Sequence, residues 1–469
     1  MLETNPNINN KFTTETLPGG DNPDHFQWTE AWYAVHYLQD LDKTKPTPFT
    51  LLGKDIVIWW DKKNQSWQTF IDQCPHRLAR LSEGRINQNG LLECPYHGWA
   101  FSGDGTCQII PQQPPGGKAE TSQRACVSSL PTTEKQGLLF VYTGNPENAA
   151  KTKIPVIEPI EESPDGWVII NTFRDVPYDA LTLLENILDP SHVAFTHHRT
   201  VGNRSKAAPL ELEVINSGKH GFKGVWKQGL KPQQTGELST TFIAPTLIWH
   251  DINSQKGRIL TVVYATPIRK GECRIIARFP FKFPSKLPGI FIKLRPRWYY
   301  HLGQNGVLED DQIFLHHQER YVEAKGGSPN ITKAFYLATK ADSFVFELHQ
   351  WVNQYNAEPF PGEPFPPPLP TAALLERYHS HTEKCASCRT ALANIQLLKF
   401  WCAIIALLAL ASSPILAFFI HPTSLSIVII ETVTPLALGL LWWRLNKLEK
   451  QFYQGRSIPP RNLPEKTEN

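Results

Sequence analysis

The chain has 469 residues, which exceeds one ordinary domain and predicts two or three folded units. Its 47 basic and 44 acidic residues leave a formal net charge of only +3, which excludes the basic footprint of a nucleic-acid-binding protein. Eight cysteines in this length do not make a disulfide scaffold, so we expect a reducing compartment.

The first 25 residues form a polar tail that is rich in Asn and Thr. The tail has no apolar core, so it does not predict a secretory signal. It also lacks arginine, the first of which is Arg77, so it does not predict an organelle transit peptide.

Residues 26–146 predict a small antiparallel β domain. Short runs of β-branched and aromatic residues, such as 56–60 and 138–142, alternate with turn signals such as 103–105. The two most informative motifs of the chain fall in loops of this region.

Those motifs are Cys74-Pro75-His76 and Cys94-Pro95-Tyr96-His97. Each supplies one thiolate and one imidazole, which is the ligand set of a Rieske [2Fe–2S] cluster. A structural zinc site could use the same four side chains, but zinc motifs usually keep like residues together, as in C-x2-C. The mixed pairs therefore favour the cluster. The segments around them resemble the oxygenase branch of the Rieske proteins, because the second loop has Tyr96 where the quinol-oxidising branch has an extra cysteine.

Residues 147–358 predict an α+β domain of the helix-grip kind, with strand-like runs at 259–266 and 274–281 and helical segments near 178–197 and 329–355. The first helical segment contains His192 and His197. Two histidines five residues apart diverge by about 140° on an ideal helix, so they can converge only where the helix breaks. Pro190 predicts such a break.

Surface or helix-terminal histidines are the ordinary alternative for this spacing. A Rieske cluster needs an electron acceptor, however, and an iron held by two histidines and one carboxylate keeps open positions for O2. The pattern D-x2-H-x4-H resembles the mononuclear iron motif of Rieske non-haem oxygenases. On that resemblance His192 and His197 are iron ligands, with His198 as a competitor for His197. Asp189 is the carboxylate that links this iron to a Rieske ligand across a subunit boundary.

The resemblance also requires a third ligand further along the chain. Residues 307–319 resemble the corresponding family segment, with Asp311 as the best match and Asp310 as the alternative. A charged turn before a strand or helix is the structural alternative for this stretch.

Residues 359–395 predict a Pro-rich extended spacer followed by a C-x2-C motif formed by Cys385 and Cys388. Three interpretations of this motif stay open. It can be a redox-active dithiol that thioredoxin reduces, a metal site together with His379 and His381, or two unlinked thiols.

Residues 396–445 predict a transmembrane hairpin, with apolar spans at 400–420 and 423–443 and a tail at 446–469. Lysine and arginine flank the two outer ends of the hairpin and are absent from its turn. The positive-inside rule therefore places residues 1–395 on the cytoplasmic or stromal side of a membrane.

This combination of features resembles the pheophorbide a oxygenase family, also described as lethal-leaf-spot cell-death suppressors and related to chlorophyllide a oxygenase. The resemblance implies O2 activation at a mononuclear iron, oxygenation of a chlorophyll-derived tetrapyrrole, and a homotrimer. No G-x-G-x-x-G signature follows a strand, so we expect electrons from a separate protein such as ferredoxin. The rival hypothesis is a membrane-tethered Rieske electron carrier or redox sensor without oxygenase turnover.

Overall fold

The computed structural model describes residues 25–228, 238–254, 257–419 and 432–464, with the side chains of α10 described up to 412. These residues form two compact units. Unit 1 contains the residues up to 293 together with 314–368, and unit 2 contains 294–313 together with 369 onward.

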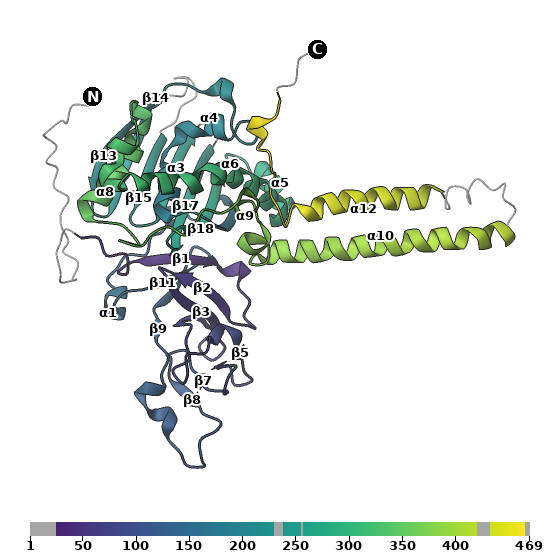
Figure 1. The fold of residues 1–469 in the computed structure, drawn as a ribbon, viewed down its shortest axis with the longest axis horizontal. Coiled ribbons are helices and arrows are strands. Elements are labelled where there is room, and N and C mark those ends of the chain that lie inside the picture. The colour runs from purple at the N-terminus through teal and green to yellow at the C-terminus, as the bar shows by residue number, and fades with distance from the viewer. Residues whose placement is uncertain (1–24, 229–237, 255–256, 420–431, 465–469) are drawn as a thin grey trace. The chain divides into compact units, whose positions relative to one another are not determined.

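The N-terminal part of unit 1 is β-rich, as predicted, and consists of three small antiparallel sheets (Figure 1). The first sheet has the order β1 (Trp32–Tyr37), β11 (Leu138–Tyr142), β10 (Thr132–Lys135). The second has the order β2 (Thr47–Leu51), β3 (Lys54–Asp61), β4 (Ser66–Ile71), β9 (Ser129–Leu130). The third has the order β5 (Arg85–Ile86), β6 (Leu92–Glu93), β7 (Ala100–Phe101), β8 (Cys107–Ile109).

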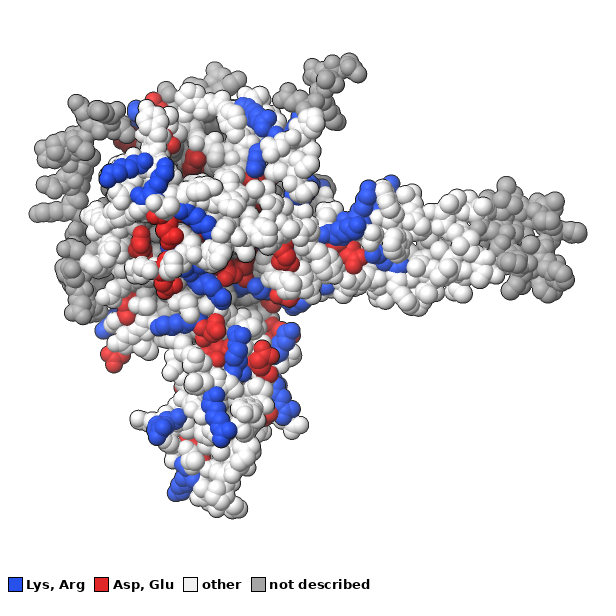
Figure 2. Space-filling model, in the orientation of Figure 1, with Lys and Arg blue, Asp and Glu red and all other residues white. Residues whose placement is uncertain are grey.

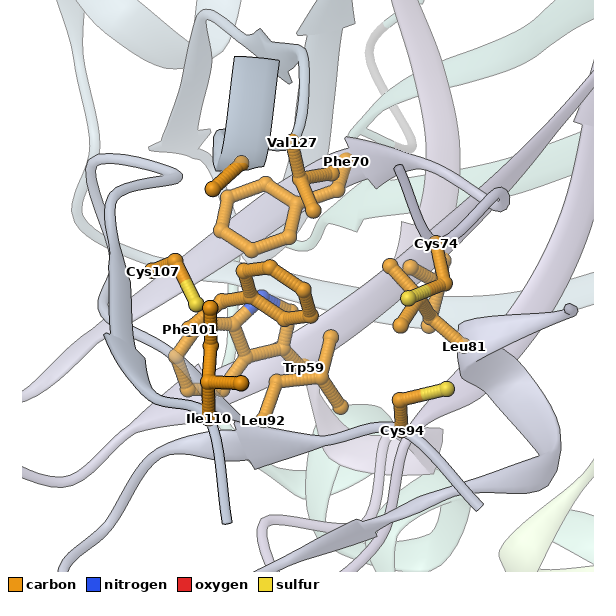
Figure 3. Packing of buried hydrophobic residues seen from close by; sticks show 12 residues of the cluster. Trp59, Phe70, Cys74, Leu81, Leu92, Cys94, Phe101, Cys107, Ile110 and Val127 are labelled. Carbon is orange, nitrogen blue, oxygen red and sulfur yellow. The ribbon is translucent and has the colours of Figure 1, made fainter. Parts of the chain in front are cut away.

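An apolar cluster fills the space between the second and third sheets. Trp59 and Phe70 are fully buried in it, with their rings edge to face at 5.5 Å between centroids. Figure 3 shows Cys74 and Cys94 together on one side of this cluster and Cys107 on the other. The packed core therefore supports the two loops that carry the Cys-His motifs.

A seven-stranded antiparallel sheet forms the centre of the rest of unit 1 and confirms the predicted α+β class. Its order is β12 (Trp167–Val176), β18 (Glu272–Lys282), β17 (Gly257–Arg269), β16 (Leu247–Ser254), β15 (Leu238–Ile243), β14 (Gly221–Gln228), β13 (Glu211–Gly218). Helix α3 (Ala180–Leu188) packs on β16, β17 and β18, and α8 (Ser343–Tyr355) packs on β13 and on α3 (Figure 1). Four shorter helices of unit 1 are α1 (Pro146–Ala149), α2 (Glu158–Glu162), α4 (Val193–Thr196) and α7 (Ile331–Ala334).

Hydrogen bonds join the N-terminal β region to this sheet within unit 1. The N–H of Gly53 donates to the carbonyl of Ile268 over 2.7 Å, and the hydroxyl of Tyr37 donates to the carbonyl of Ala277 over 2.8 Å. Tyr37 and Ala277 are buried, so the second of these bonds is shielded from competing water.

Helix α6 (Arg297–Ala324) is a long helix that the sequence patterns did not predict, and it continues through both units. It follows α5 (Leu287–Leu294). Leu315 is the one apolar side chain among the buried residues of this helix. The other buried residues are polar, and a series of them recurs every three or four positions, as on one face of a helix: His301, Asn305, Glu309, Gln312, His316 and Glu319. A hydrophobic periodicity is therefore missing from this segment, and the stretch around 307–319 is helix rather than a turn.

Unit 2 continues with α9 (Thr371–Leu374), a π-helical turn (Tyr378–Thr382), α10 (Ala386–Phe419) and α12 (Thr434–Lys450). Helices α10 and α12 lie side by side (Figure 1). By length and composition, the segment 386–412 of α10 is long and apolar enough to cross a membrane, and it is the one such helix among the described residues. The expected turn and the first part of the second span lie outside the described residues.

Candidate functional site

Cys74 and Cys94 begin two loops with the same backbone conformation. In both loops the N–H of the cysteine donates over 2.8 Å to the carbonyl five residues later, and its own carbonyl accepts from the N–H four residues later. The residue four positions after the cysteine has a positive φ in each case, 58° at Leu78 and 71° at Gly98. The two loops are therefore structural repeats that present one Cys-His pair each.

The four side chains of these loops suit the two irons of a Rieske cluster. Cys74 and Cys94 are 1% and 3% exposed, and the imidazole rings of His76 and His97 lie 4.6 Å apart. The ring of His76 stacks on Trp99 at 4.6 Å. Its Nδ1 atom is buried and has no hydrogen-bond partner in the described part of the chain, as expected of a nitrogen whose partner is a metal.

Burial also affects the protonation of Cys74. Burial, together with the neighbouring Cys94, raises the pKa of Cys74 to about 12. A thiolate at this position is therefore unfavourable at neutral pH unless a metal compensates its charge, and a coordinating metal removes the thiol proton outright.

Asp72 positions the first loop, and the sequence motifs gave no sign of it. Its carboxylate is 1% exposed and accepts hydrogen bonds from the N–H and hydroxyl of Ser82 at 2.7 and 2.6 Å. Arg80 donates to it over 3.1 Å. Asp72 precedes Cys74 by two residues, so this network fixes both ends of the loop.

The predicted helix break at Pro190 is confirmed. Helix α3 ends at Leu188, a 3-10 turn covers Pro190–His192, and α4 begins at Val193. The break brings the rings of His192 and His197 to 5.2 Å between centroids.

The contacts of the histidines separate the candidate iron ligands His192 and His197 from the competitor His198. The Nδ1 of His192 contacts the backbone carbonyl of Asp189 and lies 3.8 Å from its carboxylate, so the Nε2 faces away from that contact. His197 is 5% exposed, whereas the Nδ1 of His198 accepts the N–H of Arg204 over 3.2 Å.

Asp311 completes a possible metal-binding group. It lies on α6 and is 4% exposed, and the donor atoms of His192, His197 and Asp311 all lie within 4.8 Å of one another. Two histidines and one carboxylate form the facial triad of non-haem Fe(II) oxygenases. The carbonyl of the neighbouring Asp310 accepts from Arg461 over 2.7 Å, and its carboxylate lies 3.9 Å from the same guanidinium.

Comparison with known proteins places these features in a family. Three family models match the chain: the Rieske [2Fe-2S] domain at residues 31–132, the vanillate O-demethylase oxygenase C-terminal domain at 178–283, and pheophorbide a oxygenase at 242–329. The chloroplastic pheophorbide a oxygenase of Oryza sativa subsp. japonica is 38% identical over 85% of this chain and 80% of its own length. The corresponding Arabidopsis thaliana protein is 37% identical over 82% of this chain and 78% of its own length. The chain belongs to the pheophorbide a oxygenase family.

Other relatives show the breadth of the family. Flavonoid 8-hydroxylase 2 of Ocimum basilicum is 33% identical over 80% of this chain and 76% of its own length. Among solved structures, dicamba monooxygenase shares the fold with a TM-score of 0.57 at 20% identity, covering 70% of this chain and 97% of that chain. The family member described here is therefore an O2-dependent oxidoreductase with a [2Fe–2S] Rieske domain and a mononuclear-iron oxygenase domain, and such oxygenases take electrons from ferredoxin.

His250 supports the histidine pair from the sheet, and sequence reasoning missed it. It lies on β16, where its Nε2 contacts the carbonyl of Ile187 at 2.9 Å and its Nδ1 contacts the hydroxyl of Thr240 at 2.8 Å. Burial lowers the pKa of His250 to about 4, so the ring is neutral at physiological pH. A neutral ring donates one hydrogen bond and accepts another, which satisfies both contacts and holds the end of α3.

The C-x2-C motif lies at the start of α10, in unit 2. Cys385 and Cys388 are buried, and so is His381. The predicted participation of His379 in a metal site is wrong, because its side chain is 74% exposed and contacts the carboxylate of Glu376 at 3.2 Å. The residue that joins the group is His301 of α6.

Proposed function

We propose that this family member oxygenates a chlorophyll-derived tetrapyrrole. The observation that carries the proposal is the extent of the likeness to pheophorbide a oxygenase, 38% identity over 85% of the chain. A chlorophyllide a oxygenase of Chlamydomonas reinhardtii is also similar, at 28% identity over 70% of the chain, so a second relative is named for a chlorophyll-derived substrate.

In this proposal Cys74, His76, Cys94 and His97 hold the [2Fe–2S] cluster in a Rieske domain at 26–146. His192, His197 and Asp311 hold the mononuclear iron in an oxygenase domain at 147–358. When bound, the cluster supplies single electrons and the mononuclear iron supplies an open site for O2. The proximity of the three donor atoms of the triad, within 4.8 Å, supports this assignment over a Rieske electron carrier without turnover.

The proposal gives Asp189 a role between subunits. Its Oδ1 accepts from the N–H of Ser191 over 2.8 Å, while its side chain is 31% exposed beside His192. A partly exposed carboxylate next to an iron ligand can accept a hydrogen bond from a Rieske histidine of a neighbouring subunit. This arrangement passes electrons between subunits of a homotrimer.

Exposed apolar side chains next to both iron sites support such an interface. Leu78 and Tyr96 are 69% and 60% exposed beside the cluster ligands, and Phe195 and Val201 are 55% and 67% exposed beside the histidine pair. Large exposed apolar residues that gather at two functional sites favour burial against another subunit.

We further propose that α10 and α12 anchor the protein in a membrane. Lys399 contacts Glu449 and donates to Asn446 over 2.7 Å, and Lys447 lies 3.6 Å from the ring centre of Trp443. Tryptophan and lysine at one level of a helix pair are typical of the membrane–water interface. Figure 2 shows that the described part of the helix pair beyond this level is mostly uncharged. The remainder of the chain is then on the cytoplasmic or stromal side.

The substrate is tested by incubating the full chain, in detergent, with ferredoxin, its reductase and 18O2. The panel contains pheophorbide a, chlorophyllide a and protochlorophyllide, with a flavone as the competing substrate class. We expect 18O in one tetrapyrrole, lost in Asp311→Ala. Incorporation into the flavone alone would refute the substrate class while leaving the iron sites intact.

The iron assignment is tested by metal analysis of the same protein. We expect about three irons per chain, about two in His197→Ala, and about one in Cys94→Ala. His198→Ala is the matched control and should keep all three. Equal iron in His197→Ala and the unmodified protein would refute the second site.

The cross-subunit role is tested by co-expressing the His197→Ala and Cys94→Ala chains. Each is inactive alone, because each lacks one iron site. In mixed oligomers, an intact cluster on one subunit faces an intact mononuclear site on another, so activity should return. Mixed oligomers without activity would show that electrons stay within one chain.

The membrane assignment is tested by separating membranes from cell extract and washing them with alkaline carbonate. An anchored chain stays in the pellet, and removal of residues after 395 should release it. Release of the full chain by carbonate would refute the anchor.

A further inference from the structure

Unit 2 contains a further cluster of metal-ligating side chains. Its members are Cys385 and Cys388 at the start of α10, His381 in the preceding π-helical turn, and His301 on α6. None of the four is more than 1% exposed. They come from three separate elements, so their convergence is a property of the fold and not of a single local motif.

The donor atoms of the cluster are unusually close together. The Nδ1 of His301 lies 3.4 Å from the sulfur of Cys385, 3.4 Å from the sulfur of Cys388, and 3.2 Å from the Nε2 of His381. That Nε2 lies 3.3 Å from the sulfur of Cys388. All four atoms lie within 4.8 Å of one another.

Hydrogen bonding among the four side chains does not explain this geometry. The Nδ1 of an imidazole carries either one proton or one lone pair, so it can take part in one good hydrogen bond. Three atoms converge on the Nδ1 of His301 at 3.2 to 3.4 Å. One cation at the centre of the group would give each of the four atoms the same partner.

The spacing matches a tetrahedron around zinc. With Zn–S of ~2.3 Å and Zn–N of ~2.0–2.1 Å, a tetrahedral site has edges of ~3.3 Å between nitrogens and ~3.6 Å between nitrogen and sulfur. The observed values are 3.2 Å between the nitrogens and 3.3 to 3.4 Å between nitrogen and sulfur. We propose that Cys385, Cys388, His381 and His301 bind one structural zinc ion.

Charge and access also favour zinc over a redox-active dithiol. Two thiolates and two neutral imidazoles balance the charge of Zn²⁺, so the whole site can be buried at low cost. A dithiol that exchanges with thioredoxin needs a sulfur that another protein can reach. The sulfur-bearing residues are 0% and 1% exposed. Four protein ligands leave no open position, so the site is structural and not catalytic.

The zinc would hold α6 against the start of α10. His301 lies ten residues before Asp311 on the same helix, a rise of about 15 Å. A second contact in unit 2 acts in the same direction, since Arg377 makes a bidentate ion pair with Glu309 of α6 at 2.6 and 2.7 Å. The zinc is therefore a positioning element for the helix that carries Asp311.

The test is zinc and iron analysis of the full chain, purified without a histidine tag and without chelators. We expect about one zinc per chain in addition to the irons, and X-ray absorption at the zinc edge should give two sulfurs at ~2.3 Å and two nitrogens at ~2.0–2.1 Å. Cys388→Ser should reduce bound zinc at least about fivefold, because it removes one of four ligands. His379→Ala and Cys126→Ser are the matched controls and should keep the zinc.

If Cys388→Ser fails to fold, the unmodified protein still decides the question. Cobalt supplied during growth in place of zinc should then give thiolate-to-cobalt charge-transfer absorption with tetrahedral d–d bands. A Cys385–Cys388 disulfide in protein isolated without reductant would overturn the proposal. So would a chain that contains no zinc, or zinc that persists undiminished in Cys388→Ser.

Discussion

A buried ion pair in unit 1 gives a quantitative test of how the N-terminal β region is held to the sheet. Arg274 on β18 donates to both carboxylate oxygens of Asp175 on β12, at 2.6 and 2.9 Å, and to the carbonyl of Val35 on β1 at 3.0 Å. Its side chain is 4% exposed and that of Asp175 is 8% exposed. Arg274→Met removes these three hydrogen bonds and leaves a buried carboxylate without its bidentate partner, which costs about 3–5 kcal/mol.

The assay is the apparent melting temperature of the full chain, with the absorption of the Rieske cluster as a local probe. At roughly 2–4 °C per kcal/mol, Arg274→Met should lower the melting temperature by about 6–20 °C. The double variant Arg274→Met/Asp175→Leu removes the uncompensated charge and should recover most of that loss. Arg85→Met breaks the exposed Arg85–Glu93 pair and serves as the surface control, with an expected cost of about 0–1 kcal/mol. The reasoning fails if Arg274→Met shifts the melting temperature no more than Arg85→Met does.

Three further outcomes follow from the structure. Burial and the nearby Asp179 raise the pKa of Glu319 from 4.5 to about 8. Between these two pH values, Glu319 is protonated in the native state and ionised in the unfolded chain. Stability should therefore fall as pH rises from about 4.5 to about 8, and Glu319→Gln should flatten this slope in melting temperatures at about pH 6 and about pH 8. Leu78 and Gly98 both have a positive φ, which glycine adopts more easily than other residues. Leu78→Gly should therefore leave the free energy of unfolding unchanged or raise it slightly, whereas Gly98→Ala should lower it by about 1–2 kcal/mol. Equal melting temperatures for the two variants would contradict this. Gly224→Val should lower the melting temperature markedly, because an added Cβ would clash with the ring of Phe344. Gly218→Val is the control, because nothing lies within 4 Å of its added Cβ, and it should lower the melting temperature at least about threefold less.

The Rieske loops could be predicted from the sequence because their information is local. Cys74 and His76 are two residues apart, and Cys94 and His97 are three apart, so each pair is visible as a motif. The break at Pro190 was predictable for the same reason, since proline restricts the residue before it. In each case the spacing that matters lies within a single turn or loop.

The supporting residues could not be predicted because their partners are distant in sequence. His250 lies opposite Thr240 where β16 pairs with β15, and it contacts the carbonyl of Ile187 at the end of α3, which is 63 residues away in the sequence. His301 meets Cys385 across 84 residues. A single sequence contains no signal for such pairs, and the exposed His379 was the nearer but incorrect partner.

Helix α6 was missed for a more instructive reason. Pattern analysis detects a buried helix face by its apolar residues, but the buried residues of α6 are polar except for Leu315. Buried polar residues are costly unless they are paired or bind a metal. Along α6 that cost is offset in turn by the cysteine-histidine cluster at His301, the ion pair of Glu309 with Arg377, and the histidine pair that meets Asp311. The failure of the hydrophobic pattern in this segment is therefore itself a mark of function, because a helix keeps a buried polar face where its side chains serve a site.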